Sequence, residues 1–181
     1  MTEKDPTRFR SATLSHRKVT RFRLVPDAAT RKELAQSLDL IDLPEASLEG
    51  EIAPTGKADF ILKAQLLAHA VQSCVISLKP VQSRIDEPIA RHYLADYETP
   101  EEDEIEISED DNSEPLPEVI DLVEVLRESL ALALPPYPRA KGAELGQAVF
   151  APEGATPLRD EDLRPFAGLA ALVKKDSAED E

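Results

Sequence analysis

The residues of this chain that could carry out catalysis or bind a metal are few and far apart. The three histidines are His16, His69 and His92, and no two of them stand at a metal-ligand spacing such as H-x-x-x-H. Cys74 is the only cysteine, so the sequence predicts no intramolecular disulfide and no multi-cysteine metal site. Cys74 lies in an apolar stretch, where a free cysteine is more often buried than reactive. We therefore expect no catalytic residues and no metal site.

The glycines and the acidic residues do not predict a cofactor either. Gly142 and Gly146 flank Ala-Glu-Leu and are not followed by Lys-Ser/Thr, so the sequence has neither a Walker loop nor a dinucleotide-binding fingerprint. The carboxylates lack the alternating Asp/Asn pattern and central glycine of an EF-hand. The composition favours a binding protein without a cofactor, and a hydrolase or nuclease is the most distant alternative.

Charge is distributed unevenly along the 181 residues, whose formal net charge is -15. Residues 1–34 carry nine Lys and Arg against four acids, a net charge of +5. Residues 86–128 carry seventeen acids against two arginines, which is a net charge of -15. The molecule therefore has a basic beginning and an acidic middle, and each could attract a partner of opposite charge.

The basic candidates for RNA binding are Arg17, Lys18, Arg21 and Arg23. Residues 18–25 (KVTRFRLV) alternate, so Arg21 and Arg23 should point outward from a strand, with Val19, Phe22, Leu24 and Val25 inward. Outward arginines could contact RNA phosphates. The alternative is a solvated basic segment without a partner.

The acidic candidate is the loop of residues 97–116. A segment so highly charged cannot bury enough apolar area to offset the entropy lost on ordering, so we expect a solvated loop. It could bind a basic protein, and the alternative is a solubilising linker. The candidate protein-binding residues are Glu101, Glu102, Asp103, Glu104, Glu109, Asp110 and Asp111.

Periodicity predicts the elements that position these residues. Residues 46–94 should form three or four antiparallel strands in a meander, because their connections are too short for parallel crossovers. Helices are expected near residues 28–40, capped by Asp27 or Thr30, and near 118–134, beginning at Pro117 and ended by Pro135-Pro136. The strands within 46–94 are expected at 46–52, 58–71, 75–78 and 81–94.

Three segments resemble, in order and spacing, the YceD-like family of large ribosomal RNA subunit accumulation proteins, which carry a domain of formerly unknown function. They are residues 71–81 (VQSCVISLKPV), 121–138 (DLVEVLRESLALALPPYP) and 164–172 (RPFAGLAAL). The acidic stretch between sheet and helix is also typical of the family, and the resemblance extends over about residues 20–175.

The resemblance implies a role in accumulation of 23S rRNA during assembly of the large ribosomal subunit. It implies no catalytic residues. Many relatives have a Cys-x-x-Cys pair in the central strand, whereas Ser77 stands here at the position of the second cysteine. No zinc or redox role is therefore carried over to Cys74.

Together these observations predict an α+β domain. Its antiparallel sheet would have four to six strands, either open or barrel-like, with two main helices packed on it and a short C-terminal helix. The expected organisation is a flexible basic arm over residues 1–17, an α+β domain over 18–136 with the acidic loop, and an extension over 137–181 with a helix at 165–173 and an acidic tail.

The expected partners are 23S rRNA or a pre-50S particle, with a basic large-subunit ribosomal protein as a further possibility. The alternative function is an acidic chaperone or adaptor for such a protein, without RNA contact. The sequence shows no secretory signal and no apolar run of membrane-spanning length, so we expect a cytoplasmic location and no membrane partner.

Overall fold

The computed structural model of this protein describes residues 7–97 and 113–144. The chain divides into two compact units, residues 1–142 and residues 143–181. The fold described below is that of the first unit.

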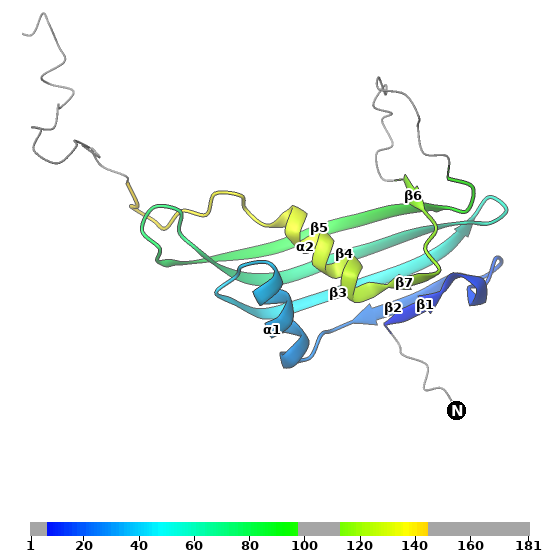
Figure 1. The fold of residues 1–181 in the computed structure, drawn as a ribbon, viewed down its shortest axis with the longest axis horizontal. Coiled ribbons are helices and arrows are strands. Elements are labelled where there is room, and N and C mark those ends of the chain that lie inside the picture. The colour runs from blue at the N-terminus through cyan, green and yellow to red at the C-terminus, as the bar shows by residue number, and fades with distance from the viewer. Residues whose placement is uncertain (1–6, 98–112, 145–181) are drawn as a thin grey trace, which may run out of the picture. The chain divides into compact units, whose positions relative to one another are not determined.

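A five-stranded sheet in the order β2-β3-β4-β5-β6 forms the centre of this unit (Figure 1). Neighbouring strands from β2 to β5 are antiparallel, whereas β6 runs parallel to β5. The strands are β2 (Thr20–Leu24), β3 (Asp42–Thr55), β4 (Asp59–Ser73), β5 (Pro80–Leu94) and β6 (Ser113–Pro115).

The sheet has a buried inner face and an outer face that is open to solvent within the described residues. Alternate residues of a strand point to opposite faces, so in β4 Leu62 and Leu66 are buried while Lys63 is exposed. The inner face is formed by Phe22 and Leu24 of β2, Leu48 and Ile52 of β3, Phe60, Leu62 and Leu66 of β4, and Ile85 and Tyr93 of β5. At Gly50 a Cβ atom would lie 2.1 Å from the carbonyl oxygen of Lys63, so glycine permits the close approach of β3 to β4.

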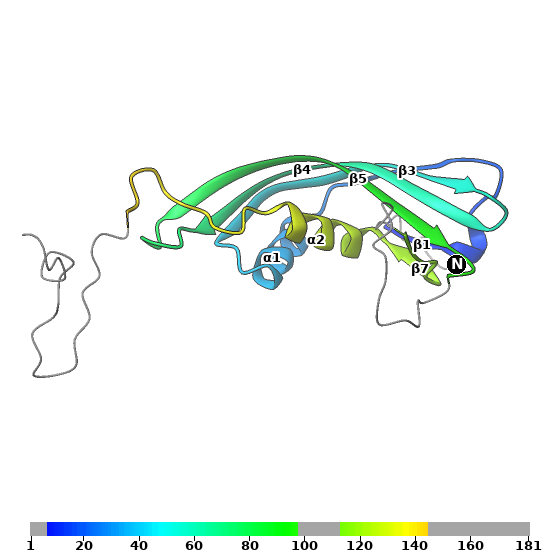
Figure 2. The ribbon, with the colours of Figure 1, turned by 90° about the horizontal axis from the view of Figure 1, so that it is seen from above.

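Two α-helices cover the inner face (Figure 2). α1 (Ala28–Ser37) begins at Asp27, whose Oδ1 accepts the Thr30 N–H at 2.8 Å, which confirms the predicted cap. α2 (Leu122–Ala133) buries Leu126 and Leu130 completely and ends before the predicted stop at Pro135.

A second, two-stranded sheet joins the start of the chain to the segment before α2. β1 (Arg8–Arg10) pairs antiparallel with β7 (Val119–Asp121) and is followed by a 3-10 turn, η1 (Ser11–Thr13). Leu14 is then buried in the core. The flexible arm expected over residues 1–17 is thus corrected for residues 7–14, because the backbone partners of β1 lie in β7, far away in the sequence, where no local pattern predicts them.

The predicted fold class is wrong. The described chain is mainly β, its sheet is mixed because β6 is parallel to β5, and β2 and β6 are separate edges, so these residues form no closed barrel. The rule that short connections force antiparallel pairing applies to the hairpins, but the connection from Leu94 to Ser113 is long enough for a parallel return. The predicted C-terminal helix at 165–173 lies outside the described residues.

Smaller details of the prediction also change. Residues 75–78 form the turn between β4 and β5, and a strand was expected there. Pro117 precedes β7 and does not begin a helix; Asp121 caps α2 by accepting the Val123 N–H at 3.0 Å. Val19 and Val25, expected to point inward, are exposed because they flank β2.

Candidate binding surfaces

The arginines predicted to meet RNA lie on the outer face, each opposite a glutamate of the next strand. Arg21 faces Glu51 and Arg23 faces Glu49 in the β2–β3 register. The ion pairs measure 3.7 Å from Arg21 Nε to Glu51 Oε2 and 3.4 Å from Arg23 Nε to Glu49 Oε2. The arginine side chains are 86% and 71% exposed, so these pairs contribute at most about 1 kcal/mol and can exchange partners.

Arg17 and Lys18 lie in the loop that leads into β2. Their backbone N–H groups donate to Ser15 Oγ at 3.2 and 3.1 Å, which forms a compact turn. Neither side chain takes part in an ion pair with another described residue. Of the four predicted RNA-binding residues, these two therefore carry the least compensated charge.

A depression of about 370 Å³ brings together three arginines from three different elements. Arg23 comes from β2, Arg31 from α1 and Arg84 from β5, and Glu45 is the only acid among the described residues that line the depression. His69 faces Glu45 on one side and Arg84 on the other in the strand register. Arginines that line one hollow could supply guanidinium groups for contacts with phosphate oxygens.

The position of Arg31 depends on backbone contacts at the start of α1. Its Nη1 donates to the Pro26 carbonyl at 2.8 Å, so the side chain folds back along the first turn. Sequence analysis did not select Arg31 or Arg84, since their proximity to Arg23 depends on the packing of α1 and on two hairpins. The alternation of β5 predicts only that Arg84 points outward.

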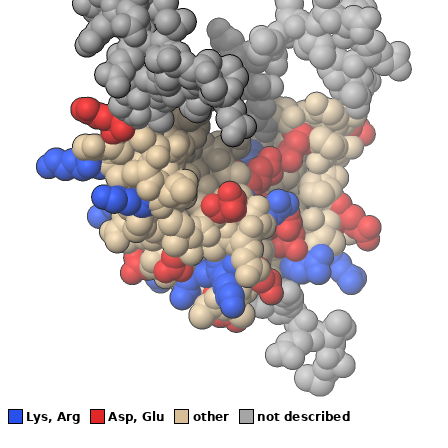
Figure 3. Space-filling model, turned by 60° about the vertical axis from the view of Figure 1, so that its left-hand side comes forward, with Lys and Arg blue, Asp and Glu red and all other residues tan. Residues whose placement is uncertain are grey.

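Charges of both signs are interspersed over the described part of the face in view (Figure 3). Lys63, for example, lies opposite Glu51 on the outer face. Lys and Arg therefore do not form one continuous basic patch on the described part of this view. A polyanion would find local cationic sites rather than a broad positive field.

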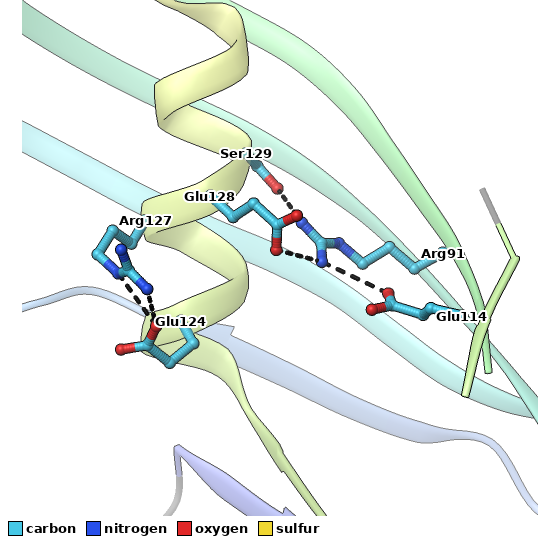
Figure 4. A network of polar contacts seen from close by, with 6 residues as sticks. All are labelled: Arg91, Glu114, Glu124, Arg127, Glu128 and Ser129. Atoms are coloured by element: carbon cyan, nitrogen blue, oxygen red, sulfur yellow. Dashed lines mark hydrogen bonds and ion pairs between the residues drawn. The ribbon is translucent and has the colours of Figure 1, made fainter. Parts of the chain in front are cut away.

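A second depression, of about 710 Å³, lies between β5 and α2 on the inner side of the sheet. Arg91 lines it, with only 12% of its side chain exposed, and binds three partners (Figure 4). Its Nη1 lies 2.7 Å from Glu128 Oε2 and 3.4 Å from Glu114 Oε1, and its Nη2 lies 3.4 Å from Ser129 Oγ. Because both carboxylates already satisfy Arg91, this network joins β5, β6 and α2 and leaves no free cation for an anion.

The electrostatics of Arg91 agree with a structural role. Burial lowers its pKa, but the hydrogen bond and charge of Glu128, with the charge of Glu114, outweigh that effect and raise the pKa above its ordinary value. Tyr93 is the next inner-face residue of β5. Burial raises the pKa of its phenol, because the charged form of this group is the deprotonated one. The network could not be predicted from the sequence, because it depends on how β5, β6 and α2 pack together.

Cys74 lies at the turn between β4 and β5 and is fully buried. Its Sγ accepts the backbone N–H of Ala140 at 3.3 Å and that of Ser77 at 3.4 Å. These hydrogen bonds, the Ala140 bond first, lower the pKa of the thiol to about 6. The Val75 N–H also donates to the Pro138 carbonyl at 3.0 Å, so the turn is tied to the segment after α2.

Over residues 7–97 and 113–144, no three His, Cys, Asp or Glu side chains are grouped so as to hold a metal ion. Neither described helix has the length and apolar composition needed to cross a membrane. The predicted acidic candidates, residues 101–104 and 109–111, lie outside the described residues.

The comparisons with known proteins place these surfaces in a family context. The family model described as "Large ribosomal RNA subunit accumulation protein YceD" matches residues 62–173. The chain belongs to this family. No curated protein and no solved structure matches it.

Membership confirms the resemblance found in the sequence. The family is named for the accumulation of the large ribosomal RNA subunit, and its name mentions no catalytic activity. The matched segment begins within β4 and includes β5 and α2. Arg84 and Arg91 therefore lie inside the YceD match, whereas Arg17, Lys18, Arg21, Arg23 and Arg31 lie before it.

Proposed function

We propose that this YceD family member is a ribosome-assembly factor that supports accumulation of 23S rRNA and of the large subunit. It acts by binding rather than by catalysis, in the cytoplasm where the subunit assembles. Family membership supports the process, and one observation supports direct RNA contact: Arg23, Arg31 and Arg84 converge on a single depression.

The energetics of the outer face allow such contact despite a net charge of -15. Glu49 is 66% exposed, so its exchange for a phosphate at Arg23 costs little. Each phosphate contact releases condensed counterions and gives binding a steep salt dependence. The acidic segment of residues 97–116 repels bulk RNA and thereby restricts binding to sites that fit the depression.

The process is tested by depleting the protein from cells. The 23S to 16S ratio and the 50S peak of a sucrose gradient should both fall. An unchanged ratio together with an unchanged 50S peak would refute the proposed process.

RNA contact is tested by titrating 23S rRNA transcripts with the protein at several salt concentrations. Replacing both Arg31 and Arg84 with Ala should weaken binding about tenfold and reduce the salt slope by about two, one for each lost phosphate contact. Lys57→Ala, which removes an exposed cation at the β3–β4 turn, is the matched control and should leave binding within about twofold. Equal weakening by the control would indicate nonspecific attraction.

The charge of the middle of the chain favours a second candidate function, a chaperone or adaptor for a basic large-subunit ribosomal protein without RNA contact. Residues 86–128 carry a net charge of -15, which complements a Lys/Arg-rich protein. This function predicts binding to such a protein that is lost when residues 101–104 and 109–111 are neutralised. It also predicts no binding to the rRNA transcripts.

A further inference from the structure

The strand β5 has a long edge without a neighbour in the described structure. β6 pairs only with His92–Leu94 at one end of the strand. From Pro80 to Arg91 the opposite edge of β5 pairs with β4, and no described strand pairs with the free edge. Unpaired strand edges are templates for a further strand, so proteins usually shorten, charge or cover them.

Two backbone hydrogen bonds show which groups point toward this free edge. The Cys74 N–H donates to the Lys79 carbonyl, so Pro80 and every second residue after it turn their backbone groups away from β4. The Leu116 N–H donates to the Leu94 carbonyl, which assigns the same outward direction to the even-numbered residues. Pro80 and Pro88 are both even, so neither removes a hydrogen bond from the β4–β5 ladder, but each leaves the free edge without an N–H donor at its own position.

We propose that this edge binds β5 of a second copy of the chain, antiparallel, about a two-fold axis through Ile85. The open stretch from Pro80 to Ala90 is centred on Ile85, and in this register the central Arg84–Asp86 pairs keep all their backbone hydrogen bonds, whereas the outer pairs that contain Pro80 or Pro88 each keep one. Arg84 of each copy then lies opposite Asp86 of the other, as a hydrogen-bonded pair on the outer face. On the inner face Val81 meets Ile89 of the second copy, and both residues are half-buried in the single chain.

Charge selects this register over the adjacent ones. Centring the pair on residue 84 places two Arg84 side chains opposite each other, and centring it on residue 86 does the same for Asp86. Like charges directly opposite each other in a sheet are destabilising, whereas opposite charges stabilise it. In this register the two copies of β5 place opposite charges and apolar residues opposite each other. A second copy therefore fits this edge better than an unrelated segment does.

The pairing has a structural consequence for the outer face. A two-fold axis perpendicular to the sheet leaves both outer faces on the same side of one continuous sheet. The two arginine depressions would therefore face the same direction. The proposal itself rests on the backbone edge and does not depend on RNA binding.

Sedimentation equilibrium of the full chain over a range of concentrations tests the pairing. The protein should associate reversibly into dimers, because an edge of this length makes a small interface. Arg84→Asp or Asp86→Arg alone should weaken association about tenfold, since each replaces two opposite-charge pairs with two like-charge pairs. An equimolar mixture of the two variants should restore association, because both pairs in the heterodimer are again of opposite charge.

The matched control is Lys63→Asp, an equal change of charge on the outer face of the central strand β4. It should leave association within about twofold. A monomeric protein at all concentrations would overturn the proposal, and so would variants whose mixture fails to restore the dimer.

Amide exchange of the edge residues is a second measurement. The Arg84 and Asp86 N–H groups should be protected only at concentrations that populate the dimer, whereas that of Ile85 should be protected at every concentration. Protection of all three that does not change with concentration would mean that another segment of the chain occupies the edge, and would also overturn the proposal.

Discussion

Arginine–glutamate ion pairs occur on both faces of the sheet, but they differ in burial and in what they contribute to the protein. On the outer face Arg21 and Arg23 are 86% and 71% exposed, and each meets one glutamate at more than 3 Å. On the inner side Arg91 is 12% exposed and binds two carboxylates and a hydroxyl. An exposed pair contributes little to folding and can be exchanged for a ligand, whereas a buried cation destabilises the fold once its partners are removed.

This difference teaches where to look for function in a charged binding protein. Arginines whose partners are exposed are available to a ligand, and arginines whose partners are fixed hold elements together. The residue type alone does not distinguish the two roles, since both kinds lie on strands of the same sheet.

The largest expected effect comes from the apolar contact beneath α2. Leu126→Ala should lower the free energy of unfolding by about 3 kcal/mol, because Leu126 is completely buried between α2 and the inner face. Leu132→Ala on the same helix is the control and should change it by less than about 0.5 kcal/mol, since Leu132 is 81% exposed. Urea unfolding measures both, and similar values for the two variants would mean that α2 does not pack as described.

An intermediate effect should separate the two kinds of ion pair. Replacing Glu114 and Glu128 with Gln leaves the Arg91 charge without a carboxylate and should cost roughly 2 kcal/mol, a value reduced for the exposure of the glutamates. The same replacements at Glu49 and Glu51 should cost less than about 1 kcal/mol. If both double variants lose equal stability in urea, the contrast between the faces is refuted.

The last prediction concerns the pH dependence of the turn at Cys74. Its thiol has a pKa of about 6 in the folded chain against an ordinary value of 9.0, because the Ala140 and Ser77 N–H groups stabilise the thiolate. A lowered pKa contributes stability that is fully present above pH 9 and is lost as the pH falls through about 6. The free energy of unfolding should therefore rise with pH across this window, and Cys74→Ala should remove that rise.

Thiolate absorbance of the folded protein provides the direct check on Cys74. It should appear near pH 6 in the folded protein and near pH 9 after unfolding. A thiol that titrates at its ordinary value in the folded state would contradict the hydrogen bonding at this turn.

Local patterns predicted the elements whose signals are short-range. The cap at Asp27, the strands that became β4 and β5, and the helix ended by Pro135 all depend on neighbours within a few residues. The parallel strand β6 and the β1–β7 pair were missed because each depends on a partner distant in the chain. The inward assignment of Val19 and Val25 was wrong, since both share the odd positions of Arg21 and Arg23, which alternation places on the outer side.

The candidate binding residues also fall into two groups, those that local patterns predicted and those whose neighbours depend on distant segments. Alternation in β2 correctly placed Arg21 and Arg23 on the outer face, and whether they bind RNA stays a prediction. Their glutamate partners were not predicted, because the β2–β3 register sets them. The convergence of Arg31 and Arg84 on Arg23 required the packing of α1 and the hairpins of the sheet.

The sequence by itself therefore determined the family, the charge segregation and the strand and helix periods, since these reside in residue order and composition. Only the tertiary structure decided which arginines are held and which are available, and which strand edge is open. The physical reason is that burial, register and hydrogen-bond direction are properties of contacts between distant segments.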